Sequence, residues 1–244
     1  MARRLLEVAA NSLASALAAQ AGGAGRIELC TGLEMGGLTP SPGQIALVRE
    51  QVALPLYVLI RPRAGDFLYS DTDMETMRRD IESCAALGCD GVVLGVLDAD
   101  GQVDTPRCRE LIRAAGSMGV TFHRAFDMTQ DLSRSLEDVI ALGVERVLTS
   151  GAARSALEGA DTLRMLVAQA GDRIIVMPGA GVRPDTIGEL ARFTGAREFH
   201  ASAKRDLPSG MHHKNVVLTD MSGGEIRSDA GEVHALTVAL HNLA

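Results

Sequence analysis

The chain has 244 residues, of which 46% are hydrophobic, so it can bury a sizeable core. Its 24 basic and 31 acidic residues give a net charge of −7 without a basic cluster, which argues against nucleic acid and anionic membranes as partners. Near the N-terminus, Glu7 and Asn11 interrupt an apolar stretch, and no run reaches the ~18 apolar residues of a membrane span. We therefore expect a cytoplasmic protein.

The predicted elements follow a repeat that runs along the chain. Four times, a glycine ends a helix and an apolar strand begins a few residues later, at Gly23, Gly88, Gly143 and Gly195. Each interval has room for two strand–helix units of about 30 residues. The remaining strands are expected at Leu5–Ala9, Leu56–Arg61, Val120–Arg124 and Arg173–Met177.

Helix starts complete the pattern, because proline is favoured in the first turn of a helix. They are expected at Ser41–Pro42, Thr105–Pro106 and Arg183–Pro184, with further helices at Leu132–Leu142 and Glu232–Leu243. Eight strands alternating with eight helices predict an α/β fold, a single-domain (β/α)8 TIM-type barrel. Its core would cover about residues 4–203, followed by a C-terminal loop and final helix in 204–244. An open doubly wound sheet is the competing fold, but the even repeat favours closure.

Alternation along the strands predicts a polar cavity at the C-terminal end of the barrel. Charged side chains that faced the outer helices would be buried without partners, so we place them inside. The side chains expected to converge are Glu7, Glu28, Arg61, His123 and His200, with Arg63, Arg124 and Asp127 in or near the rim. The catalytic candidates are Glu7, Glu28, Arg61, His123 and Asp127. The alternative is an inert plug in which Arg61 neutralises Glu7 and Glu28.

An anion-binding site is expected beside this cavity. Loops after strands 7 and 8 hold phosphate in many barrels of this type, and glycines let backbone N–H groups approach an anion. The residues in these positions are Gly179, Gly181 and Ser202, near the helix expected to begin at Pro184. Arg63, Arg124 and His200 are further candidates for binding an anionic ligand.

Several motifs together resemble one family. Between about Leu6 and Ala203, the chain resembles the CutC family of copper-homeostasis proteins, because it contains motifs typical of that family in the typical order. These motifs are "RIELC", "GGLTPSPG", "IRPRAGDFLYS", "VTFHRAFDM", "RVLTSG", "MPGAGV" and "EFHASA". The resemblance implies a cytoplasmic TIM-type barrel, a homo-oligomer (dimer or tetramer), and a part in copper handling. It does not imply a particular enzymatic reaction.

The resemblance also implies a copper ligand. Members often carry two cysteines near the tops of strands 1 and 2, and Cu(I) prefers such soft ligands. Here Cys30 matches the second cysteine, whereas Ala9 stands in place of the first. A two-sulfur site would therefore need Met35, a histidine or a second subunit. Met211, His212 and His213 offer further ligands, but adjacent residues in a polar loop are usually surface. Cys84 and Cys108 lie on apolar helical faces and are expected in the core, and Cys89 is expected to begin a strand.

Three functions remain open from the sequence. The first is copper homeostasis, with Cu(I) as the suspected ligand. The second is an acid–base enzyme, a lyase or isomerase acting on a small anionic or phosphorylated metabolite. It would not use a Schiff base, because neither Lys204 nor Lys214 lies in a barrel strand. A variant of it has a divalent metal held by Glu7, Glu28, His123 and His200. The third is a non-catalytic binding module.

Overall fold

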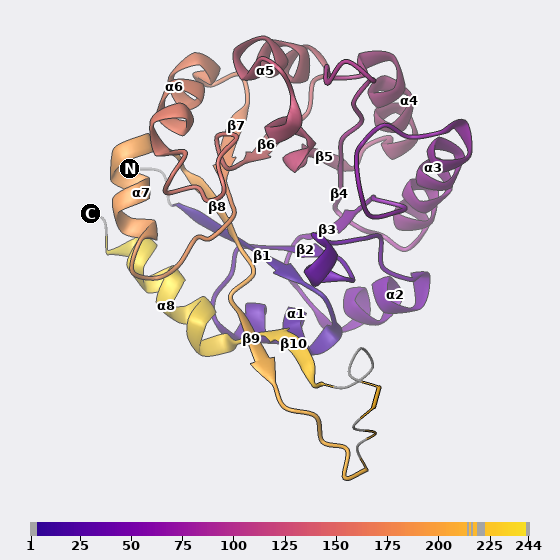
Figure 1. Ribbon diagram of the computed structural model, residues 1–244, viewed down its shortest axis with the longest axis vertical. Coiled ribbons are helices and arrows are strands. Elements are labelled where there is room, and N and C mark those ends of the chain that lie inside the picture. Colours follow the sequence, from indigo (N-terminus) through magenta and orange to yellow (C-terminus); the bar gives the residue numbers. More distant parts are fainter. Residues whose placement is uncertain (1–3, 214, 216, 219–222, 243–244) are drawn as a thin grey trace.

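The strands form the predicted barrel in a computed structural model that describes residues 4–213, 215, 217–218 and 223–242 (Figure 1). The strands are β1 Leu5–Ala10, β2 Arg26–Leu29, β3 Leu56–Leu59, β4 Gly91–Leu94, β5 Gly119–Phe122, β6 Arg146–Thr149, β7 Ile175–Pro178 and β8 Glu198–Ala201. They pair in parallel in sequence order from β1 to β7, and β1 also pairs with β8. A doubly wound sheet would reverse its strand order at a switch point. The TIM-type fold is therefore confirmed, and β7 lies in contact with β8 where the ring closes.

Helices surround the strands as an outer ring (Figure 1). They are α1 Leu13–Ala21, α2 Pro42–Gln51, α3 Asp71–Ala86, α4 Thr105–Ala115, α5 Leu132–Ala141, α6 Ala160–Ala170, α7 Ile187–Thr194 and α8 Ala230–His241, with short 3-10 turns η1 Leu33–Met35 and η2 Arg124–Met128. The four glycines of the repeat have φ between +73° and +88°, in the left-handed region that only glycine adopts without strain. None of the helices in the described part of the chain is long and apolar enough to cross a membrane.

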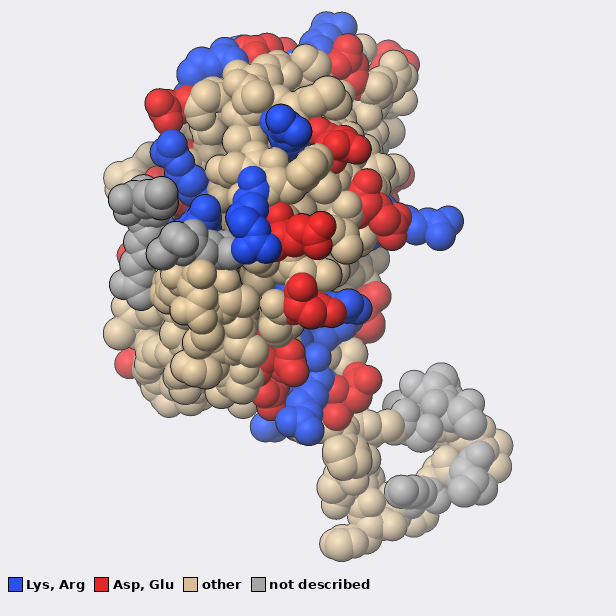
Figure 2. Space-filling model, turned by 90° about the vertical axis from the view of Figure 1, so that its left-hand side faces the viewer, with Lys and Arg blue, Asp and Glu red and all other residues tan. Residues whose placement is uncertain are grey.

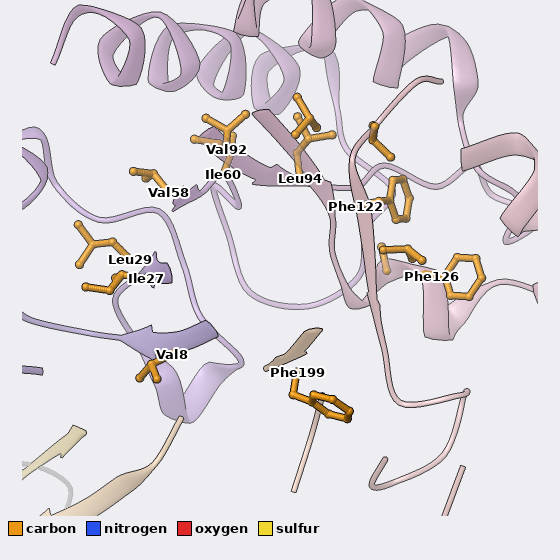
Figure 3. Packing of buried hydrophobic residues seen from close by; sticks show 14 of the residues in the cluster. Val8, Ile27, Leu29, Val58, Ile60, Val92, Leu94, Phe122, Phe126 and Phe199 are labelled. Carbon is orange, nitrogen blue, oxygen red and sulfur yellow. The ribbon is translucent and has the colours of Figure 1, made fainter. Parts of the chain in front are cut away.

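The apolar core lies between the strands and the helices (Figure 3). Outward-facing strand residues such as Ile27, Val92 and Phe199 are fully buried against the helices. Burying one such side chain contributes about 1.5–3 kcal/mol. The inward positions, in contrast, carry charged side chains, as the alternation predicted. The barrel interior is therefore free to hold a polar site.

Several boundaries differ from the sequence prediction. α7 begins at Ile187 rather than near Pro184, because Arg183–Thr186 form a turn in which the N–H groups of Thr186 and Ile187 both bond to the Arg183 carbonyl. β7 begins two residues later than predicted, at Ile175. α8 begins at Ala230, capped by Asp229, and Leu243 lies outside the described residues.

The segment predicted as a C-terminal loop contains a two-stranded antiparallel ribbon. β9 Lys204–Leu207 pairs with β10 Glu225–Ser228. Ser228 fixes β10 to the barrel, because its hydroxyl donates to the Ala9 carbonyl (3.1 Å) and its N–H donates to Ser15 (3.1 Å). β9 and residues 208–213 extend away from the barrel (Figures 1 and 2). On the face in Figure 2, basic and acidic side chains are interspersed.

Candidate functional site

Two arginines and two glutamates fill the lower part of the barrel. Arg26 donates from Nε to Glu7 and from Nη2 to Glu198 (2.6 Å). Nε of Arg146 lies 3.2 Å from the same Glu198 carboxylate. The Tyr57 ring packs on both guanidinium groups, at 5.3 and 5.0 Å. Because these charges are paired inside the barrel, the layer forms a charge-paired floor beneath the site.

Glu7 belongs to this floor and also to a second group, which it forms with Glu28 and His200. His200 Nδ1 lies 2.8 Å from Glu7 Oε1 and 3.5 Å from Glu28 Oε2. One donor atom from each of the three lies within 4.8 Å of the others. Glu28 Oε2 is buried and has no hydrogen-bond partner among the described residues. We refer to these three residues as the carboxylate–imidazole group.

The two carboxylates of this group have opposite pKa shifts. Burial alone would raise the pKa of Glu7, but the Arg26 cation and His200 lower it to about 2. Glu28 has no arginine partner, and burial raises its pKa to about 7 despite the nearby His200. Burial opposes the charge on His200, yet Glu28 and Glu7 raise its pKa above the ordinary value. Near neutral pH, Glu7 is therefore ionised, whereas Glu28 still holds a proton in part of the molecules.

A cavity of about 730 Å³ opens above the group at the C-terminal end of the strands. Of the predicted site residues, the following line it: Glu28, Cys30, Arg61, His123, Arg124, Asp127, Gly181, His200 and Ser202. Glu7 is fully buried beneath it. Gly179 and Arg63 are not among its lining residues. Gly179 packs beside Leu148 and His200, where a Cβ atom would collide with Leu148 at 2.5 Å.

Arg61 does not neutralise Glu7 and Glu28, so the plug arrangement that the sequence left open is wrong. Its Nη1 donates to the carbonyls of Met35 and Gly37 (both 2.8 Å), and its Nη2 donates to that of Gly65 (2.9 Å). The guanidinium therefore holds the loops after β2 and β3 at the cavity wall. The partner of Glu7 is Arg26 instead.

Arg63, in the loop after β3, is not among the residues that line the cavity. Its guanidinium pairs with Asp66 (2.9 Å) and Asp73 (3.3 Å) and packs over the Tyr69 ring. Arg63 was expected in or near the rim; it does not line the cavity, and its charge is already paired.

Asp127 joins two neighbouring strand ends. Its carboxylate accepts hydrogen bonds from the backbone N–H groups of Ser150 (3.0 Å) and Ala152 (3.1 Å) and from the Thr149 hydroxyl, in the loop after β6. It also pairs with Arg124 at 2.7 Å. All of these interactions hold the mouth of the cavity together, so Asp127 positions the loops rather than offering a free base.

The anion-binding expectation concerns the loops after β7 and β8. Gly181 and Ser202 line the cavity, next to Ala180, whose φ of +75° makes the turn after β7 tight. The N-terminal amides of α8 (Gly231 and Glu232) already bond to Asp229. That helix end is therefore occupied by the protein's own carboxylate.

Comparison with known proteins identifies the family of this barrel. The CutC family model matches residues 4–205. The chain belongs to the CutC family. A CutC family protein of Xanthomonas campestris pv. campestris is 58% identical over 96% of this chain and 98% of its own. The mouse copper homeostasis protein cutC homolog is 48% identical over 86% of this chain and 78% of its own. A crystal structure named for the copper homeostasis protein CutC of Streptococcus agalactiae has a TM-score of 0.78 and 31% identity, and covers 82% of this chain and 98% of that one.

In this CutC chain, Cys30 is the copper ligand that the resemblance implies, and Ala9 occupies the position of the other cysteine. Cys30 and Ala9 both line the cavity. Burial, with Glu28 and Glu34 nearby, raises the pKa of the Cys30 thiol, so the thiolate form that binds Cu(I) is disfavoured. Met35 is not a lining residue, whereas the exposed Met128 is.

The other ligand and nucleophile candidates of this CutC chain lie outside the cavity, except one lysine. Cys84, Cys89 and Cys108 are buried, and Cys89 lies just before β4 rather than in it. The segment Met211–His213 is exposed. Lys204 lines the cavity from β9, and Lys214 lies outside the described residues.

Sequence reasoning missed Arg26, Arg146 and Glu198, which form the floor. The signal was present, because residues two apart in a strand point to the same face. Arg26 therefore shares a face with Glu28 and Cys30, and Glu198 shares a face with His200. Arg146 opens β6 two residues before Leu148, which lines the cavity. The same alternation that found the carboxylate–imidazole group would have found them.

Proposed function

We propose that this CutC protein takes part in copper homeostasis by binding a copper ion at the carboxylate–imidazole group. The observation that carries the proposal is the convergence of Glu7, Glu28 and His200 donor atoms within 4.8 Å at the base of the cavity. Family membership and the names of the mouse and streptococcal relatives support copper as the ion.

The charges of the barrel interior favour a cation at this point. Glu7, Glu28 and Glu198 are three largely buried carboxylates, whereas Arg26 and Arg146 supply two guanidinium groups. One negative charge is left over, and the proton that Glu28 holds below about pH 7 balances it. A copper ion would take the place of that proton.

The donor types favour Cu(II) over Cu(I). Carboxylate and imidazole ligands suit a divalent ion, whereas Cu(I) prefers thiolates and thioethers. Glu28 and His200 line the cavity and would hold the ion, with the buried Glu7 as third ligand. Bound there, copper would be held by ligands of low exposure. Its binding would release a proton, which makes the affinity dependent on pH.

The test is a Cu(II) titration by calorimetry across pH. As pH rises toward 7, the affinity should increase, because Cu(II) must displace the proton of Glu28, and it should continue to increase until His200 is deprotonated as well. Glu28→Gln should weaken binding strongly and flatten the pH dependence. Glu232→Gln is the matched control, because Glu232 lines the same cavity outside the group.

Equal affinities of Glu28→Gln and the unchanged protein would contradict the proposal. A Cu(I) titration under reducing conditions with Cys30→Ser distinguishes the thiol site. If only Cu(I) binds, and Cys30→Ser abolishes its binding, the copper site is Cys30 and the carboxylate–imidazole group is not the ligand.

A further inference from the structure

Arg61 is a buried cation without a counter-ion. Its side chain is 7% exposed, and its Nη atoms donate only to neutral backbone carbonyls. Among the described residues, no carboxylate forms an ion pair with Arg61, and its Nε has no hydrogen-bond acceptor. Buried charges in proteins are normally paired, so a negative charge is missing at this point of the cavity wall.

His123 is a neutral imidazole whose tautomer is fixed by the backbone. The Ala125 N–H donates to Nδ1 at 3.2 Å, so Nδ1 carries a lone pair rather than a proton. Burial first, and the Arg61 charge next, lower the pKa of His123 to about 3. The single proton of the neutral ring therefore lies on Nε2. This Nε2–H group is buried and has no acceptor among the described residues.

The two unsatisfied donors belong to one part of the cavity. The Phe67 ring lies 5.0 Å from the His123 ring and 5.3 Å from Arg61 Cζ, so both side chains pack on the same aromatic. Arg61, His123 and Phe67 all line the cavity. Leaving a buried donor unsatisfied costs about 1–3 kcal/mol, and here there are two. One bound group with two acceptor oxygens and a negative charge would satisfy both.

We propose that Arg61 and His123 form a subsite for the carboxylate of a small ligand. Two oxygens match the two free N–H groups, and the single negative charge matches the single guanidinium. The subsite is built from the ends of β3 and β5, whereas the proposed copper ligands come from β1, β2 and β8. It therefore goes beyond the copper proposal and does not depend on it.

Nitrogen-15 NMR of the histidine rings, with acetate as probe, tests the subsite in the full chain. The spectrum should show one histidine protonated on Nε2 alone at neutral pH, missing in His123→Phe. Acetate should shift that signal saturably. His123→Phe should weaken acetate binding about tenfold to hundredfold, since a hydrogen bond to a charged group is lost. His212→Phe, in the exposed segment, should have no effect.

Three results would overturn the subsite. These are an Nδ1-protonated His123, acetate binding unchanged in His123→Phe, and inorganic phosphate binding more tightly than acetate with the same dependence on His123. Glu28→Gln separates this proposal from the copper site, because it should bind acetate normally. Loss of acetate binding in Glu28→Gln, with His123→Phe unaffected, would assign the anion to the carboxylate–imidazole group instead.

Discussion

At the scale of single residues, the chemistry of the site depends on which of three buried carboxylates has an arginine as its partner. Arg26 bonds both Glu7 and Glu198, and Arg146 also approaches Glu198, whereas Glu28 has no arginine. Glu7 is therefore charged with a pKa of about 2, and Glu28 has a pKa of about 7. Two chemically identical side chains thus have different roles because one arginine lies beside one of them.

Arg26→Met should test this dependence. Removing one partner of a buried pair leaves an uncompensated charge, and we expect a loss of about 3–5 kcal/mol in the free energy of unfolding. Arg173→Met is the control, because its pair with Glu137 is about half exposed, so solvent screens it and its loss should change stability little. Urea denaturation at pH 7 measures both. The double variant Glu7→Gln/Arg26→Met should lose less than Arg26→Met, and equal losses for Arg26→Met and Arg173→Met would refute the argument.

At the scale of elements, neighbouring loops at the barrel mouth are held by single side chains. Asp127, in η2 after β5, accepts from the backbone of Ser150 and Ala152 after β6. Arg61 after β3 donates to the Met35 and Gly37 carbonyls in the loop after β2. Neighbouring loops of the cavity wall are therefore tied to one another by these hydrogen bonds.

Asp127→Ala should loosen the loop after β6 without unfolding the barrel. Hydrogen bonds to a charged acceptor are worth about 1.5–3 kcal/mol, so the amides of Ser150 and Ala152 should exchange about tenfold to hundredfold faster. Amide hydrogen exchange measures this directly. Asp131→Ala, which removes the cap of α5 nearby, should leave those two amides unchanged. Unaltered exchange in Asp127→Ala would show that other contacts hold the loop.

The sequence predicts the barrel well because the strand–helix repeat is local, and its glycines and prolines have local causes. It predicts inward-facing residues for the same reason, since alternation needs only the strand. The sequence does not predict which side chains of neighbouring strands meet, because that depends on how far each strand is shifted along the next. In the register, Glu7 lies beside Arg26 and His200, and Glu28 lies beside Tyr57. Arg61 is four residues beyond Tyr57, roughly 13 Å further along the strand, so it cannot reach the glutamates.

At the scale of the whole molecule, the buried histidine and glutamates set how stability depends on pH. His123 has a folded pKa of about 3 against an ordinary 6.5, so between these values the unfolded chain binds one more proton, and stability falls as pH falls. Glu7, at about 2 against 4.5, adds a second such proton below pH 4.5. Glu28, at about 7 against 4.5, acts oppositely, because the folded chain binds the extra proton and stability falls as pH rises.

These contributions predict that the free energy of unfolding is constant over one pH range and falls steeply at lower pH. Between pH 4.5 and 6.5, His123 and Glu28 cancel, so the free energy of unfolding should be nearly constant. Below pH 4.5, His123 and Glu7 act together, and stability should fall by about 3 kcal/mol per pH unit. Urea denaturation at a series of pH values gives the curve.

His123→Gln should change the curve in two places at once. Below pH 4.5, the free energy of unfolding should depend less steeply on pH, because the unfolded chain takes up one proton fewer on acidification. The slope should decrease by about 1.4 kcal/mol per pH unit. The plateau should become a decline with rising pH, because Glu28 is then unopposed between pH 4.5 and 7. His212→Gln, which changes an exposed histidine, should reproduce the original curve. A plateau that survives in His123→Gln would mean that neither the lowered pKa of His123 nor the raised pKa of Glu28 contributes to stability at these pH values.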